Sequence, residues 1–125
     1  MAAPNIVNVA SILGITTAVG LGTTAVTTFL SNASASGKVL KINTVVAAGI
    51  GVANADITVK YHLAAAGAGT SIAVANTITV PASSSLVIIG KDNPIYLEEN
   101  RSLTAKASSA NNIAIICSYE EIGEV

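Results

Sequence analysis

The feature of this sequence that most restricts its fold is the spacing of its turn residues. Short runs rich in Val, Ile and Thr are separated by Gly, Asn, Ser and Pro roughly every eight to twelve residues, as in sandwiches and barrels. No stretch places apolar residues at i, i+3, i+4 and i+7 beside a charged face, which is the pattern of an amphipathic helix. The sequence therefore predicts an all-β fold, and we expect an antiparallel β-sandwich of the jelly-roll type with about eight or nine short strands.

Individual strands are predicted from alternation and from apolar runs. Residues Ile57–Leu63 give the clearest pattern, because one face carries Ile57 and its apolar alternates while the other carries polar residues. His62 lies on that polar face, and we expect it to be solvated or to make an interface contact. The run Ser85–Ile89 is apolar enough to be buried on both faces. The remaining strands are expected at residues 5–10, 23–30, 39–46, 72–80, 95–98, 103–107 and 113–119.

The side-chain composition predicts a light core and a chain that depends on its neighbours. The 125 residues suffice for one β-sandwich domain (1–125), with 51% hydrophobic but only 3% aromatic residues. The core must then consist of Ala, Val, Ile and Leu, and burying one of the larger of these contributes about 1.5–3 kcal/mol. Since so small a domain is marginal alone, we expect a homo-oligomer, with a trimer as one option, or a larger assembly.

The distribution of charge excludes several kinds of partner. Charged residues make up 10% of the chain, and the six Lys and Arg are scattered, so no basic patch can hold nucleic acid. Residues 1–37 carry no charge. Ile12–Leu30 has the length of a membrane span, but its six Thr and three Gly favour strands and turns, and no Lys or Arg precedes it as in a signal peptide. We expect neither a nucleic-acid nor a membrane partner.

The titratable residues predict no catalytic, cofactor-binding or metal site. His62 and Cys117 are the single residues of their kinds, so we expect no histidine-ligated metal and no internal disulfide, and Cys117 is interpreted as a small buried apolar residue. The adjacent carboxylates at 98–99 and 120–121 point to opposite faces of a strand. We expect Asp92, Glu98 and Glu99 to be solvated turn and edge charges. A Ca²⁺ loop formed by these three residues is the alternative, but the alternating oxygen ligands of such loops are missing. We expect that the protein is not an enzyme.

Six segments follow one another in a familiar order along nearly the whole chain: MAAPNIVNVA (1–10), SGKVLKINTVV (36–46), ADITVKY (55–61), ITVPASSSLVII (78–89), KDNPIYLEE (91–99) and SYEEI (118–122). Together they resemble small virion structural proteins of tailed phages, especially phages of marine cyanobacteria. The resemblance implies a β-sandwich component of the virion that is assembled in the host cytoplasm. It does not imply a particular part of the particle.

These observations favour a structural role in a phage particle, most of all as a head decoration or cement protein that binds and stabilises the head lattice. A neck, tail, baseplate or fibre-base protein is the main alternative. A receptor- or glycan-binding module is a further alternative, and it requires a groove lined by Tyr61, Tyr96 or Tyr119. The expected partners are copies of the chain itself and other phage structural proteins, such as the major capsid protein.

The N-terminal segment is the predicted interface. Residues 1–10 are interpreted as an arm or edge strand in which Pro4 suits an edge position and Ile6, Val7 and Val9 supply apolar contacts. Exposed on a free monomer, such an uncharged apolar segment would promote aggregation. We therefore expect it to cross to a neighbouring subunit or to the particle surface and add a strand there.

Overall fold

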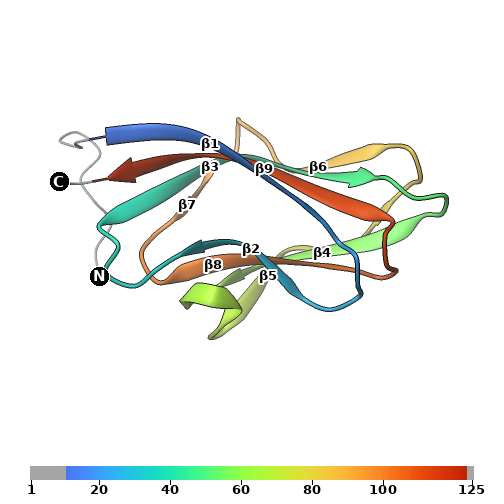
Figure 1. Ribbon diagram of the computed structural model, residues 1–125, viewed down its shortest axis with the longest axis horizontal. Helices are drawn as coiled ribbons and strands as arrows, with labels where there is room; N and C mark the ends of the chain where they lie inside the picture. Colours follow the sequence, from blue (N-terminus) through green and yellow to red (C-terminus); the bar gives the residue numbers. More distant parts are fainter. Residues whose placement is uncertain (1–10, 124–125) are drawn as a thin grey trace.

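Two antiparallel sheets pack face to face in the computed structural model, which describes residues 11–123 (Figure 1). The described elements, in chain order, are β1 (Ser11–Gly20), β2 (Thr27–Asn32), β3 (Lys38–Gly49), β4 (Ala55–His62), the short 3₁₀ helix η1 (Ala65–Gly67), β5 (Ser71–Val80), β6 (Ser85–Ile89), β7 (Ile95–Leu97), β8 (Arg101–Ala107) and β9 (Ile113–Gly123).

The strand order is that of a jelly roll. Sheet A has the order β1-β9-β3-β6, with β7 also paired to β3, and sheet B has the order β2-β8-β4-β5. The chain passes between the sheets at nearly every connection, and every pair of neighbouring strands is antiparallel. A five-stranded and a four-stranded sheet linked in this way form the double Greek key, with β6 and β7 together in the place of one edge strand. The predicted all-β, jelly-roll-like sandwich is therefore confirmed.

The core between the sheets is built from aliphatic side chains, as the composition predicts. Phe29 is the one aromatic residue of this core among those described, while Tyr61 and Tyr119 pack against the core from partly buried positions. In the last strand, alternate residues from Ile113 to Cys117 are buried in this core. The largest fully buried aliphatic side chains are Leu21, Ile42, Ile57, Leu97, Leu103, Ile113 and Ile115.

Some predicted strands differ from those observed. No strand was predicted at residues 11–20, where β1 lies, and the one predicted at 23–30 begins only at Thr27. The prediction that Ser85–Ile89 is buried on both faces is wrong: β6 is an edge strand, and Val87 exposes 61% of its surface. The strand predicted at 5–10 lies outside the described residues. From 11 to 123 the chain contains no helix with the length and apolarity needed to span a bilayer.

The imperfect alternation of the third strand has a local cause. The register of β3 against β9 shifts between Ile42 and Thr44. As a result, Leu40 and Ile42 point into the core before the shift, and Val45 and Ala47 do so after it. The core-facing positions of β3 change from even-numbered to odd-numbered residues along the strand, and the bulge keeps them on the same buried face.

Gly49 ends β3 at a close approach of backbones. Its N–H donates to the Ser84 carbonyl at 2.6 Å, and its own carbonyl accepts the Ser83 N–H at 3.0 Å. A Cβ at Gly49 would collide with the Pro81 carbonyl oxygen. The turn between β5 and β6 therefore packs against this position only because it is glycine.

We predict that Gly49→Ala lowers the free energy of unfolding by about 1–3 kcal/mol, because the turn must move to admit the methyl group. Gly90→Ala is the matched control, since a Cβ there meets only an ordinary contact with Val87. Urea denaturation of both variants measures the difference. Equal stabilities would show that the turn yields without cost.

Candidate assembly surfaces

β1 is an edge strand of sheet A with an unusually regular pairing. Its ten residues pair with β9 from Ser11 opposite Gly123 to Gly20 opposite Ala114 without a register shift. None of them is charged, a proline or buried. Ile12 and Leu13 expose 56% and 54% of their surfaces. Natural edges are usually protected by charge, proline, bulges or short length, and β1 has none of these features.

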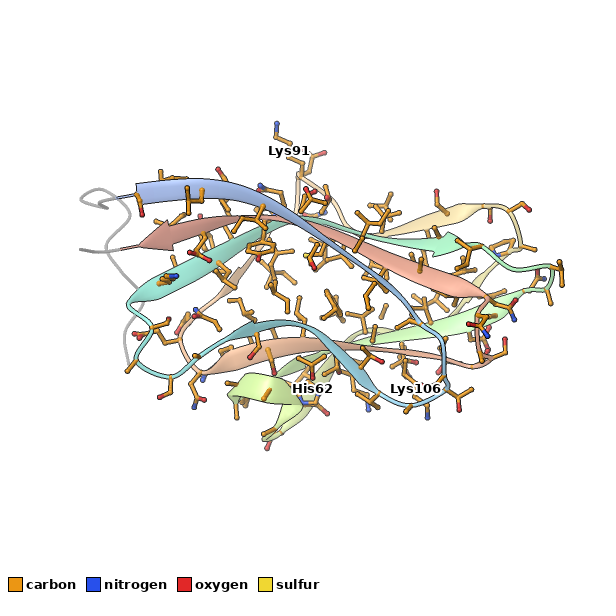
Figure 2. All side chains as sticks on the ribbon, in the orientation of Figure 1. His62, Lys91 and Lys106 are labelled. Carbon is orange, nitrogen blue, oxygen red and sulfur yellow. The ribbon has the colours of Figure 1, made fainter. Side chains whose placement is uncertain are left out.

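The other three sheet edges are interrupted. β2 has six residues and shifts register between Thr28 and Leu30. β5 shifts register twice against β4, and Thr77 within it has a φ of 52°. The edge opposite β1 consists of two short strands, β6 and β7, separated by a turn from which Lys91 projects (Figure 2). Each of these edges is a poor template for a further long strand.

The outer face of sheet A is largely apolar. Exposed Ile116 and Val87 lie on it, and the ion pair recorded there joins Lys41 Nζ to Glu120 Oε1 at 4.0 Å. Apolar side chains that lie in one row across the four strands are Ala18, Ile116, Val46 and Val87. The face is thus suited to being covered by another molecule.

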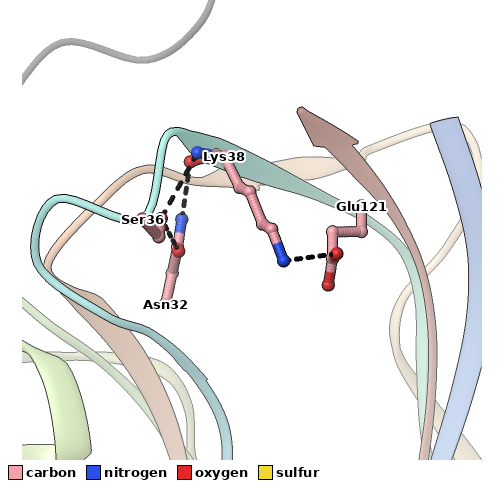
Figure 3. Close-up of polar contacts among 4 residues, drawn as sticks. All are labelled: Asn32, Ser36, Lys38 and Glu121. Atoms are coloured by element: carbon pink, nitrogen blue, oxygen red, sulfur yellow. Dashed lines mark hydrogen bonds and ion pairs between the residues drawn. The ribbon is translucent and has the colours of Figure 1, made fainter. Parts of the chain in front are cut away.

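A buried polar cluster closes the sandwich at the end where β1 begins (Figure 3). The Asn32 side-chain amide donates to the carbonyls of Lys38 and Leu97 at 2.9 and 3.0 Å, and its oxygen accepts the Ser36 hydroxyl at 2.6 Å. Lys38 Nζ also contacts Glu121 Oε1 at 2.8 Å. The buried asparagine therefore links β2 of sheet B to β3 and β7 of sheet A.

Glu99 extends this cluster and corrects a prediction. It was expected to be a solvated turn charge, but it is buried, and its Oε2 accepts the Gly37 N–H at 2.9 Å. The loop between β2 and β3 covers it, which the sequence near Glu99 does not indicate. Asp92 and Glu98 are exposed instead. Within residues 11–123 no three acidic, His or Cys groups gather as metal ligands.

Two adjoining hollows mark the outer face of sheet B. Their volumes are about 370 and 260 Å³, and both are bordered by Thr58, Thr77 and Lys106. Lys60 borders one and Asp56 the other, where Asp56 accepts the Thr79 hydroxyl at 2.9 Å. The lining thus offers hydroxyl and ammonium groups but no aromatic ring on which a sugar could stack.

The three tyrosines do not form the groove that a glycan-binding module requires. Tyr61 of sheet B and Tyr119 of sheet A both pack against the core, and burial raises the pKa of each phenol. Tyr96 is exposed on β7. None of them borders the two hollows.

His62 is not solvated, contrary to the first of its two predicted environments. It exposes 8% of its surface, and its Nε2 lies 2.8 Å from the Thr104 hydroxyl. The η1 turn covers this pair. The turn itself is held in place by a hydrogen bond of 2.8 Å from the Gly67 N–H to the Ser102 hydroxyl. Figure 2 shows His62 on the outer side of sheet B beneath η1. Thr104 also borders the smaller hollow, but both side chains of the pair are buried, which indicates a structural role.

Cys117 agrees with its prediction. Its exposed fraction is 0%, it faces the core, and burial raises the pKa of the thiol to about 12. The residues of the predicted interface, Pro4, Ile6, Val7 and Val9, lie outside the described part of the chain. The unprotected edge of β1, which begins directly after them, is the surface that sequence reasoning missed.

Two solved structures share this fold. No family model matches the chain, and no curated protein sequence does either. A chain of the disulfide-linked pili of Bacillus endospore appendages aligns over 92% of this chain and 90% of its own, with a TM-score of 0.56 and 12% identity. A chain of infectious bursal disease virus, Gx strain, aligns over 91% of this chain and 32% of its own, with a TM-score of 0.50 and 13% identity.

These likenesses show the fold; one neighbour belongs to a pilus and the other to a virus. The chain spans about a third of the viral chain it matches. The disulfide linkage of the pili has no counterpart at Cys117, because the single cysteine of this sequence is buried in the core.

We predict that His62→Ala lowers the free energy of unfolding by about 1–3 kcal/mol, because the Thr104 hydroxyl loses its partner and a void forms beneath η1. His62→Gln is the control, since its amide can reach the position of Nε2. Thermal denaturation should place the glutamine variant between the wild type and the alanine variant. An alanine variant as stable as the wild type would contradict the structural role.

We predict that the native Cys117 thiol does not react with a thiol reagent at pH 8 and reacts once the chain is unfolded. Its pKa is raised from 9.0 to about 12, so an unfolded thiol ionises in that interval while the folded one stays protonated. This contribution to stability is complete below about pH 9 and is lost as the pH rises toward about 12. Cys117→Ala, compared with the wild type by denaturant titration, should lose stability less steeply over this range.

Proposed function

We propose that this chain is a structural subunit of a phage particle, and that it is a head decoration or cement protein. The observation that supports a structural role is the combination of a closed jelly-roll core with a long, uncharged and unprotected edge at β1. A free monomer gains nothing from such an edge, whereas a subunit that is covered by neighbours tolerates it.

The alternatives have less support in the described residues. A catalytic function needs groups that can be tuned by their surroundings. Here the one histidine bonds to a buried threonine, and the one cysteine is buried with a raised pKa. A glycan-binding function needs an aromatic surface, and the tyrosines are dispersed. A neck, tail or baseplate protein remains the alternative within the particle, because the same fold serves either position.

The position in the particle is tested by copy number. Quantitative mass spectrometry of purified particles of the virus that encodes the chain should find the chain in hundreds of copies, in fixed ratio to the major capsid protein. About a dozen copies would place it in the neck or baseplate instead. Absence from the particle would contradict the proposed function.

The proposed partners are further copies of the chain and the major capsid protein, joined as the particle forms in the host cytoplasm. The N-terminal arm is the proposed contact, with Pro4, Ile6, Val7 and Val9 at its centre. Burying two or three aliphatic side chains there provides about 4–8 kcal/mol before ordering costs. Such a contact, repeated over many copies, is sufficient to hold a light protein on a lattice.

We predict that deletion of Met1–Ala10 leaves a folded protein that joins particles at strongly reduced copy number. Replacing Ile6, Val7 and Val9 by serine should have the same effect, because it removes the apolar contacts and keeps the length of the segment. Replacing Asn5 and Asn8 by serine is the matched control. Mass spectrometry and the heat resistance of the particles are the measurements. Full copy number with unchanged heat resistance after the deletion would show that the arm has no such role.

A further inference from the structure

The backbone groups at the edge of β1 can be assigned a direction. Leu21, directly after β1, donates its N–H to the Ile113 carbonyl and accepts the Asn111 N–H at its own carbonyl, both at 2.9 Å. Both of its backbone groups therefore point toward β9. On the other side of β9, the Ile50 N–H donates to the Asn112 carbonyl at 2.9 Å. The backbone groups of Asn112 and Ile113 therefore point to opposite sides, Asn112 toward β3 and Ile113 toward β1.

In an antiparallel pair, residues alternate between those that bond to the partner strand and those that point away from it. The register of β1 against β9 is unbroken, so the odd-numbered residues of β1 bond to β9 like Leu21. The even-numbered residues then present their N–H and C=O groups to the free edge: Ile12, Gly14, Thr16 and Ala18.

We infer that the free edge of β1 pairs antiparallel with β1 of a second copy of this chain, so that the two A sheets become one continuous sheet across a two-fold axis. The contact concerns two copies alone and holds whichever particle the chain joins. Its failure would therefore leave the proposed function standing.

The choice of occupant follows from what the edge requires. A partner strand must be long, regular and uncharged to satisfy the alternate backbone groups of β1 without burying an unpaired charge. Among the described strands with a free edge, β1 alone meets these conditions, because β2 and β5 are bulged and β6 and β7 are short. Self-pairing of β1 is also isologous, so it closes after two copies and does not form an open fibre.

The two faces of the sheet restrict the register. An even-numbered residue of one β1 must lie opposite an even-numbered residue of the other, and an odd-numbered one opposite an odd-numbered one. A register shifted by one residue would place inward-facing side chains opposite outward-facing ones. The two allowed registers with the largest overlap place the two-fold axis at Ile15 or at Thr16. Exposed Ile12 and Leu13 then flank the junction on opposite faces, and Thr16 lies within one residue of the axis.

The size of the contact predicts a weak dimer. Nine paired residues make a contact roughly 30 Å long, and at a depth of about 10 Å it covers roughly 600 Å² over both copies. Stable interfaces bury about 1,200–2,000 Å². We therefore expect the free protein to dimerise with a dissociation constant on the order of 10 µM to 1 mM, and to do so more fully when an assembly holds copies close together.

The test uses the purified full-length chain in sedimentation velocity over a concentration series. The wild type should pass from monomer to dimer. Thr16→Lys should remain monomeric, because two ammonium groups meet near the axis. Ser85→Lys is the matched control: Ser85 is an exposed residue on the outer face of the same sheet at the opposite edge, so this variant should dimerise like the wild type.

A proline pair tests the assigned direction of the backbone groups. Thr16→Pro removes an N–H that points to the free edge, so the variant should fold and stay monomeric. Thr17→Pro removes an N–H that bonds to β9, so it should lose stability sharply. Thr16→Lys keeps the inference testable if neither proline variant folds.

Spin labels measure the geometry in a Cys117→Ala background. Labels at Thr16→Cys should lie within about 20 Å of each other, and labels at Ser11→Cys roughly 27–34 Å apart, the two ends of that range marking the two registers. The inference is overturned by a wild type that stays monomeric to about 1 mM, by equal association of Thr16→Lys and Ser85→Lys, or by growth beyond a dimer. It is also overturned if deletion of Met1–Ala10 alone abolishes the dimer, because the occupant of the edge would then be the arm.

Discussion

The structure depends on the position of β9 between β1 and β3. Ten of its eleven residues pair with β1 on one side and all eleven with β3 on the other, and alternate side chains from Ile113 to Cys117 lie in the core. Among the described strands β1 pairs with β9 alone, and Val19 of β1 also packs against the core. One central strand therefore contributes side chains to the hydrophobic core and also positions the edge strand to which a further strand can be added.

The polar groups that the fold buries lie where loops cover the ends and the outer face of the sheets. Asn32 and Glu99 fix the connection between the sheets at one end, while His62 and Thr104 lie beneath η1. These groups bond to one another or to the backbone, except that the buried Nδ1 of His62 has no hydrogen-bond partner. The apolar outer face of sheet A and its β1 edge are suited to contact with protein, whereas the hollows on sheet B are lined by polar side chains.

The sequence was sufficient to predict the strands that alternate cleanly and are buried on one face, such as those around Ile57 and Ile113. It was insufficient for β1, because this strand lies at an edge with both faces exposed, and its Gly, Thr and Ala residues show no contrast between the faces. The burial of His62 and Glu99 was also beyond prediction. Each is covered by a loop that reaches it only through the tertiary fold, so no local pattern marks it.

The register of β1 against β9 also determines where the described chain starts and stops. Ser11 and Gly123 are paired neighbours, so the two ends lie side by side at one pole of the sandwich (Figure 1). At the opposite pole the β3–β4 turn carries the fully exposed Val52. A circularly permuted gene that joins the old ends through a short linker and opens the chain at this turn would retain every strand pair. It would also move the points available for fusing a cargo protein from one pole to the other.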